Sequence, residues 1–502
     1  MARSGTGSWA AAYHSATKHT PSSVRTRGWQ LDWDNRPAPF KRYPGRETVA
    51  LPEPRPVAGR SALEAIATVT VDEPRGGLDL AGLARLLAFG AGVARGRVFP
   101  GGDVFYFRTY ACAGALYPVE VYVCCGDLDG LAAGVYHFDP LNTALVRLRR
   151  GDHRAHLVRA TGVEPAMAAA PAALVLTGIP WRTTWKYTQR GYRHLFWDAG
   201  MILANLTALA AAARVPTRAV TGFADSEIEA LLRLDGRREF PLCLLSLGVG
   251  PRVEPAPEPA RAEAFESPPL SRREVEFPEI LAVNDAGRLP SGAAVASWRE
   301  GRGLPRAEEV APPGAADDSI EAVIVRRGSA RAFRPGAVPA GVLADILARA
   351  TRGVATDIVP NGSRLVRPYL VAHDLGGLEP GAYVFERGAL RLLRGGRFRQ
   401  EAAFLCLEQL LGGTGAATHF LMADLGGVLG VYGDRGYRAA QLEAGVVAGR
   451  IYLGAYAHRL GATGLTFYDD EVTAFFSPDA AGLSCLLVVA VGESTRLLAE
   501  VP

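Results

Sequence analysis

The alternation of hydrophobic and polar positions predicts the same set of helices and strands in each half of the chain. The segments 197–216 and 442–461 are apolar on nearly every side, as in helices that are buried all round. Each is followed by an apolar run, FPLCLLSLGVG or LSCLLVVAVGE, that fits a buried strand. The order of helix, strand, strand, long helix, short loop and strand predicts an α+β fold in which helices cover a mixed sheet.

Sequence motifs recur in the same order in the two halves. GVYHF at 134–138 returns as GAYVF at 381–385, and RGYR at 190–193 returns at 435–438, an offset of 435 − 190 = 245. After the long segments, GFADSEIEALL is matched by TFYDDEVTAFF. Ordered matches of this kind indicate an internal duplication. We therefore expect two similar domains with the long helices at their interface. The repeated Arg190, Tyr192 and Arg193 are interpreted as structural residues that bind helix ends or acidic partners.

The duplication sets the predicted domain boundaries. The first half covers 56–252 and the second half 318–502. Residues 1–55 are expected to form an extended arm whose tryptophans pack against the body. Residues 253–317 are rich in Pro, Ala and Glu, and a linker that wraps one half around the other is the expected structure, with a short helix near 293–299.

Composition narrows the functional classes. The net charge of +4, from 55 basic and 51 acidic residues, argues against nucleic acid or a membrane surface as the partner. We find no apolar stretch of the roughly 20 residues that a membrane helix needs, and no signal peptide. The six cysteines form no CxxC pair and are expected to be mostly buried, reduced thiols, which favours a cytoplasmic location. No metal site is predicted.

One basic segment has the residue types that bind a phosphate. Its candidate donors are Arg326, Arg327, Ser329 and Arg331, placed where a helical pattern gives way to an extended one. Guanidinium groups and a hydroxyl on one side of the chain suit a phosphate. A solvated basic stretch is the alternative for such a run taken alone.

This segment resembles the R-x-S-x-R/K-x-F flavin-phosphate motif of the nitroreductase family. The resemblance implies that Arg327 and Ser329 hold an FMN phosphate and that Arg331 reaches the pyrimidine edge of the ring. It also implies two tandem nitroreductase-like α/β/α domains that form an intramolecular pseudo-dimer, which can exist as a monomer.

A segment of the first half, RTYACAGALYP at 108–118, is similar to the R-x-x-P-S-x-G-x-x-Y-P segment of SagB-type dehydrogenases, a branch of that family. By this resemblance the flavin edge is lined by Arg108, Ala111, Cys112 and Gly114. Ala111 and Cys112 stand where the branch has Pro-Ser, so the hydroxyl donor is missing. The resemblance also implies that Gly464, Leu465 and Thr466 offer a backbone N–H to flavin N5, and that Arg496 is a second phosphate-binding cation.

Lys186 and Tyr187 are the candidate catalytic residues. Burial or a neighbouring charge can move the pKa of either side chain toward neutrality. They match a Lys-Tyr pair that is implicated in catalysis in the azoline oxidases of the SagB-type branch. The alternative is that Lys186 is solvated and that Tyr187 only packs.

The two halves have lost different parts of such a site. The first half has SALEAIATVTVDEP in place of the phosphate motif. The second half has residues 359–362 in place of the 111–114 segment, and Val431-Tyr432 in place of Lys186-Tyr187. Because the family binds its flavin at a dimer interface, we expect one FMN, held by both halves.

The expected function is FMN-dependent dehydrogenation of a small or peptide-derived heterocycle such as an azoline, with hydride transfer to flavin N5 and possible biosynthetic partner enzymes. One alternative is an NAD(P)H-dependent reductase of nitro, quinone or enone groups. The other is a non-catalytic flavin-binding scaffold in a biosynthetic complex.

Overall fold

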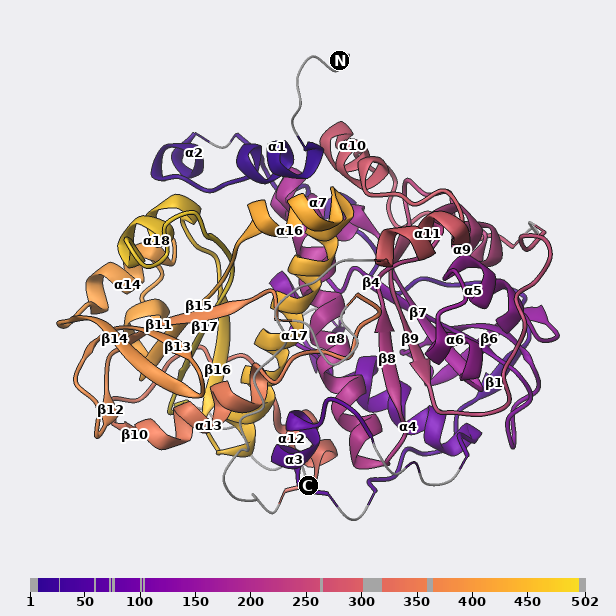
Figure 1. Ribbon diagram of the computed structural model, residues 1–502, viewed down its shortest axis with the longest axis horizontal. Helices are drawn as coiled ribbons and strands as arrows, with labels where there is room; N and C mark the ends of the chain where they lie inside the picture. The colour runs from indigo at the N-terminus through magenta and orange to yellow at the C-terminus, as the bar shows by residue number, and fades with distance from the viewer. Residues whose placement is uncertain are drawn as a thin grey trace.

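Two similar α+β halves flank a pair of long central helices, α8 (Gly191–Ala212) and α17 (Arg435–Ala457), which lie side by side in Figure 1. The computed structural model describes residues 8–26, 28–57, 60–71, 74, 77–99, 102, 104–261, 265–300, 318–358 and 364–495. Nearly every residue of both helices is buried. This confirms that segments apolar on all sides form the interface between the halves.

The main sheets of the two halves have the same strand order. The first sheet runs β1-β6-β5-β4-β7-β9-β8 and the second β14-β13-β11-β15-β17-β16, so every strand except β1 has a counterpart. All neighbouring strands within these two sheets pair antiparallel, so the expectation of a mixed sheet was wrong. The bounds are β1 Thr48–Ala50, β4 Val119–Cys125, β5 Gly134–Asp139, β6 Ala144–Arg150, β7 Ala172–Gly178, β8 Thr217–Val220, β9 Phe240–Leu247, β11 Arg367–Ala372, β13 Gly381–Glu386, β14 Ala389–Gly395, β15 Ala417–Ala423, β16 Gly461–Leu465 and β17 Ser484–Gly492.

The remaining elements cover these sheets and connect the halves. The short strands are β2 (Val93–Val98) and β3 (Val104–Arg108), which form a hairpin, and β10 (Val338–Pro339) and β12 (Leu375–Gly376). The helices are α1 Trp9–Ala16, α2 Pro21–Arg25, α3 Ala62–Ala67, α4 Leu80–Ala91, α5 Arg154–Ala160, α6 Pro165–Ala169, α7 Pro180–Tyr187, α9 Asp225–Leu232, α10 Pro278–Ala286, α11 Gly292–Arg299, α12 Ile320–Arg326, α13 Ala340–Ala350, α14 Arg399–Leu405, α15 Leu411–Thr414, α16 Leu425–Tyr432 and α18 Asp469–Phe476. The 3₁₀ turns are Trp33–Asn35, Ala113–Ala115 and Thr188–Arg190.

Glycines allow α8 and α17 to cross at very short range. A Cβ on Gly200 would lie 2.4 Å from Leu442 O, and one on Gly445 would lie 2.4 Å from Trp197 O. Gly200 and Gly445 are 245 residues apart, the same offset as the RGYR repeat, so the crossing lies on the pseudo-twofold axis that relates the halves. A side chain at either position would force the helices apart.

The span Pro180–Ala212, which includes α8, is long and apolar enough to cross a membrane by length and composition. The expectation that no stretch meets this criterion was therefore wrong. The window is 94% buried inside the protein, as in a core helix.

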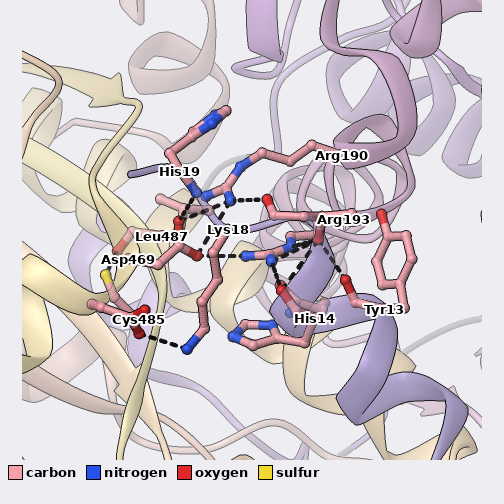
Figure 2. A network of polar contacts seen from close by, with 12 residues as sticks. Tyr13, His14, Lys18, His19, Arg190, Arg193, Asp469, Cys485 and Leu487 are labelled. Atoms are coloured by element: carbon pink, nitrogen blue, oxygen red, sulfur yellow. Dashed lines mark hydrogen bonds and ion pairs between the residues drawn. The ribbon is translucent and has the colours of Figure 1, made fainter. Parts of the chain in front are cut away.

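Buried ion pairs join the N-terminus of each long helix to the other half. Figure 2 shows Arg190, the N-cap of α8, and Arg193 of α8 around Asp469, the first residue of α18, with N–O distances of 2.9 and 2.7 Å. On the other side of the pseudo-twofold axis, Arg435 and Arg438 of α17 each lie 2.7 Å from Asp225, the first residue of α9. The predicted acidic partners of the repeated arginines are thus confirmed.

The duplication extends into the arm and the linker. Arg193 donates to His14 O and Arg438 donates to Asn284 O, both at 2.6 Å. Arg190 donates to Thr17 O, and Arg435 to Gly287 O. These acceptors follow an offset of 284 − 14 = 270, and α1 and α10 lie next to each other in Figure 1. Residues 278–289 are therefore the second half's counterpart of the N-terminal arm. The arm itself contains α1 and α2 and is not simply extended, and α11 forms where the sequence predicted a helix.

The first prediction concerns the Arg190–Asp469–Arg193 ion pairs. Asp469→Asn leaves two buried arginines without their carboxylate, so we expect the free energy of unfolding in urea to fall by about 3–5 kcal/mol at pH 7. Asp470→Asn is the matched control, because Asp470 is 64% exposed and pairs only with Lys18 in the described chain; its effect should stay below about 1 kcal/mol.

The same ion pairs make this stabilisation dependent on pH. Burial alone would raise the pKa of Asp469, but Arg190 and Arg193 outweigh it and hold that pKa well below its usual range. The stabilisation is therefore complete above about pH 4 and is lost as the pH falls further. A difference between the protein and Asp469→Asn that stayed constant down to pH 2 would contradict this assignment.

Candidate active site between the halves

The predicted phosphate-binding segment begins at the end of α12 and reaches across to the first half. Arg327 is buried, and its guanidinium donates to the carbonyl oxygens of Arg108 at 3.0 Å and Thr109 at 3.3 Å. Ser329 is exposed and its hydroxyl lies 3.5 Å from Tyr452 Oη. Arg326 instead pairs with Asp318 and donates to Tyr456 O, so its guanidinium is already bound within the second half. The structure thus brings Arg327 against the 108–118 segment.

Arg108 itself supports the fold of this segment. Its guanidinium donates to Ala91 O at the end of α4 and to Pro39 O of the arm. It also lies 4.9 Å from the Phe40 ring and 5.5 Å from the Tyr117 ring. The side chain therefore faces the arm, and it is the Arg108 backbone carbonyl that meets Arg327.

A buried carboxylate on α8 holds the next residues of the segment. Asp198 accepts from the Cys112 thiol at 3.0 Å and from Ala113 N at 3.3 Å. Tyr117 N donates in turn to Cys112 Sγ at 3.1 Å. Burial raises the pKa of Asp198 to about 7, although both hydrogen bonds lower it. Burial and the nearby Asp198 raise the pKa of the Cys112 thiol well above its usual value, so Cys112 stays a neutral thiol.

The other cysteines lie in the positions that the sequence indicates. Cys124, Cys125, Cys243, Cys406 and Cys485 are buried and none of them is in a disulfide. The prediction of mostly buried, reduced thiols is confirmed.

The 108–118 segment packs directly on Lys186 and Tyr187. Gly114 has a φ of 64°, which favours glycine, and a Cβ there would lie 2.9 Å from Tyr187 Oη and 3.4 Å from Lys186 Nζ. Ala111, which precedes Cys112, is buried. The missing side chain at Gly114 leaves room for the end of α7, so the two groups predicted for the ring pocket are in contact.

Lys186 and Tyr187 have opposite electrostatic environments. Burial, followed by the nearby positive charges of Arg331 and Arg36, lowers the pKa of Lys186. Burial, Cys112 and Asp198 raise the pKa of Tyr187, whose ring stacks on His194 at 4.2 Å. Lys186 has no carboxylate partner among the described residues. Both environments therefore disfavour the charged form of the side chain, the ammonium of Lys186 and the phenolate of Tyr187.

The second half contributes the end of β16 and two tyrosines of α17. Gly464 N donates to Tyr452 Oη, and the Thr466 hydroxyl accepts from Gln409 at 2.7 Å, while Leu465 is buried. Tyr452 thus links the candidate flavin loop at 464–466 to Ser329. The predicted N–H donor at Gly464 is already bound to Tyr452 Oη in this arrangement. Arg496 lies outside the described residues.

The equivalent position on the other side of the pseudo-twofold axis is filled by the protein itself. Residues 220–222 correspond to 464–466, and Asp357 accepts from Thr221 N at 2.7 Å and from Gly222 N at 2.9 Å. Arg299 of α11 donates to the same carboxylate at 2.8 Å. A Cβ on Gly222 would lie 2.9 Å from the Trp298 ring, so that ring also covers the loop. Residues 359–362, predicted to replace the ring segment, lie outside the described residues.

The residues between the halves fit an anionic cofactor such as FMN. Arg327 is a buried cation, and no carboxylate of the described chain pairs with it. The Thr109 hydroxyl and the Tyr110 phenol are buried, and neither has a hydrogen-bond partner in the described part of the protein. Buried polar groups normally find partners, so these groups are available to a bound molecule.

Sequence reasoning missed three residues of this site. Asp198 is the only acid of α8, a helix that is buried along nearly its whole length, and a buried charge of that kind was a usable signal. Tyr452 and Tyr456 are four residues apart on α17, which places them on the same helix face. Both lie near Arg327 and act to raise its pKa, although burial lowers it overall.

The model of the nitroreductase family matches residues 77–249 and 324–493, which together make up well over half of the chain. The chain belongs to the nitroreductase family. The two matched regions coincide with the two halves of the fold, so this nitroreductase-family oxidoreductase is a tandem pseudo-dimer.

Individual relatives agree with this assignment. MJ1384 of Methanocaldococcus jannaschii, named as a nitroreductase, is 32% identical over 142 residues, or 28% of this chain and 70% of that protein. The microcin B17-processing protein McbC of Escherichia coli is 30% identical over 146 residues, and this match spans 28% of the chain and about half (54%) of McbC. A solved structure from Anabaena variabilis, described as a nitroreductase, matches 97% of this chain and 100% of its own with a TM-score of 0.74. Its sequence identity of 24% shows the shared fold alone.

The second prediction tests Asp198 in this nitroreductase-family pocket. The folded protein keeps a proton on Asp198 up to about pH 7, whereas the unfolded chain loses it near pH 4. Stability relative to Asp198→Asn should therefore fall as the pH rises from about 4 to 7, by up to about 1.4 kcal/mol per pH unit. Urea unfolding at several pH values measures this. Cys112→Ala removes a hydrogen bond that lowers this pKa and should extend the fall to higher pH. A stability difference between the protein and Asp198→Asn that did not change with pH would contradict the raised pKa of Asp198.

Proposed function

We propose that this protein is an FMN-dependent dehydrogenase or oxidase of the SagB-type branch, with one flavin held between its two halves. The substrate class is a small or peptide-derived heterocycle such as an azoline. The observation that carries the proposal is that Arg327 of the second half and the Lys186–Tyr187 pair of the first half both lie against the 108–118 segment, at Arg108 O and at Gly114. The 30% identity to McbC supports the same branch. A cytoplasmic location and biosynthetic partner enzymes remain part of this proposal.

The proposal assigns separate roles to the residues around the cofactor. Arg327 and Ser329 would hold the phosphate, and Gly114 and Cys112 would lie along the ring. Flavin, when bound, supplies the hydride acceptor. Oxidation of an azoline removes a proton from one ring carbon and a hydride from its neighbour, so that a carbon–carbon double bond forms. Lys186 would take the proton, because a lowered pKa favours its neutral amine. Tyr187 would stay protonated and orient the substrate by donating a hydrogen bond.

The third prediction concerns flavin stoichiometry. Extracted FMN should amount to about one molecule per chain, because Asp357 and Trp298 occupy the equivalent position on the other side. Arg331→Ala changes an exposed residue and should weaken FMN binding about 10-fold or more. Arg334→Ala, an exposed arginine just beyond the motif, should bind FMN normally. Two molecules per chain would refute the single-site proposal, and a protein that cannot be loaded with FMN would favour a scaffold role.

The fourth prediction tests the Lys-Tyr pair in FMN-loaded protein. Lys186→Met should lower kcat for azoline oxidation by about 10²–10⁴-fold, as expected for loss of a general base. Tyr187→Phe should lower kcat less than Lys186→Met does. In this variant kcat should still rise with pH, because the Lys186 amine is still present to lose its proton. Tyr432→Phe is the matched control, because Tyr432 stands at the corresponding position of the second half, where its hydroxyl donates to Ile358 O. Full turnover by Lys186→Met would overturn the proposed mechanism. Rapid bleaching of the flavin by NADPH alone would instead favour the nitro, quinone or enone reductase.

A further inference from the structure

The N-terminal arm brings one arginine, Arg36, close to the candidate site. Before it, Trp29 donates to Trp185 O at 2.8 Å, and Trp185 donates back to Asp32 O at 2.9 Å. The Trp33 ring also meets the Trp185 ring edge-on at 5.1 Å. These contacts attach the arm to α7 one residue before Lys186, as expected for tryptophans that pack against the body.

The chain after Arg36 is attached just as firmly. Ala38 O accepts from Arg182 at 3.0 Å, and Pro39 O accepts from Arg108 at 3.2 Å. Arg182 lies on α7 and Arg108 begins the ring segment. Arg36 therefore lies in a short stretch of the arm that is attached on one side to α7 and on the other side to both α7 and the 108–118 segment.

The Arg36 guanidinium is oriented by an aromatic ring and not by an acid. It lies 5.0 Å from the centre of the Phe105 ring, on the β2–β3 hairpin, and burial lowers its pKa. No carboxylate of the described chain pairs with it. Stacking on an aromatic face leaves the edge of a guanidinium free for a planar anion such as a carboxylate.

Three cations from separate segments influence one another electrostatically at this position. Arg36 of the arm and Arg331 of the phosphate segment are the charged groups close enough to Lys186 to lower its pKa. Asp198, the acid that packs against the 108–118 segment, already accepts hydrogen bonds from Cys112 and Ala113. Positive charges gathered without a carboxylate indicate a site for anions. FMN would be matched by Arg327 and Ser329 at its phosphate and by Arg331 at its ring, which leaves Arg36 for a second anion.

We propose that Arg36 binds a carboxylate of the substrate, so that the preferred substrates are azolines with a carboxylate on the ring carbon that gives up the proton. This inference rests on the proposed function. Arg36 would fix the carboxylate in a bidentate pair and so place the acidic ring hydrogen against Lys186. Arg36 is thus a substrate-positioning residue.

The experiment compares 2-methylthiazoline-4-carboxylate with its carboxamide in the FMN-loaded full chain. We expect the protein to prefer the carboxylate by about 10-fold or more in kcat/KM. Arg36→Ala should remove this preference by raising KM for the carboxylate about 10–100-fold, with kcat and the carboxamide reaction nearly unchanged. Arg36→Lys should restore only part of it, because an ammonium cannot pair in a bidentate manner. Arg97→Ala is the matched control, since Arg97 stacks on Phe99 of the same hairpin at 5.1 Å.

A binding measurement separates substrate recognition from turnover. Titration with the product, 2-methylthiazole-4-carboxylate, followed by the flavin absorbance, should give a Kd about 10-fold or more weaker in Arg36→Ala. FMN content should stay the same in this variant. If FMN binding falls instead, Arg36 serves the flavin phosphate and the inference is overturned. If Arg36→Ala raises KM for NADPH but not for the carboxylate, the anion is a dinucleotide phosphate and the inference is also overturned.

Two outcomes separate a failure of the proposed function from a failure of the Arg36 inference. Protein that binds no FMN, or that oxidises neither azoline, overturns the proposed function. Protein that binds FMN and oxidises the carboxylate and the carboxamide equally well overturns the Arg36 inference alone.

Discussion

The close crossing of α8 and α17 is the constraint on which the rest of the structure depends. Gly200 and Gly445 let the two backbones touch, and buried Arg–Asp pairs at the N-termini of the helices fix the angle and register of the contact. Packed cores and buried ion pairs tolerate little sliding. Arg327 of one half therefore meets the Arg108 carbonyl of the other within hydrogen-bond distance, although the residues are far apart in the chain. A site shared between domains needs an interface that does not move.

The duplication explains why this interface has two equivalent positions and why only one suits a cofactor. Each half once had the same elements, as the matching strand orders and the α1–α10 correspondence show. At the second position, the Asp357 carboxylate accepts hydrogen bonds from the backbone amides of the 220–222 loop, and the Trp298 ring covers that loop. A carboxylate held by amides and Arg299 can stabilise the interface without a ligand. The fused chain could thus lose one site without weakening the contact between its halves.

The sequence predicted those parts of the fold that depend on local pattern. The buried long helices follow from apolar residues on all faces, and the arginine partners follow from the repeated RGYR motif. The sequence did not reveal the counterpart of the arm, because the contacts that the two halves share use the backbone carbonyls of 284 and 287. Such contacts place little constraint on side-chain identity. The antiparallel pairing of the sheets and the roles of Asp198 and Arg36 depend on tertiary neighbours that no local pattern encodes.

The different roles proposed for Lys186 and Tyr187 rest on their surroundings and not on residue type alone. Burial disfavours the charged form of both side chains, so it lowers the pKa of the lysine and raises that of the tyrosine. Cations near Lys186 and the Cys112–Asp198 pair near Tyr187 act in the same directions as burial. Two titratable groups whose pKa values are moved in opposite directions have distinct roles in proton transfer. Arg331 of the second half and Arg36 of the arm both act to lower the pKa of Lys186, so residues far apart in the chain set the environment of the proposed base.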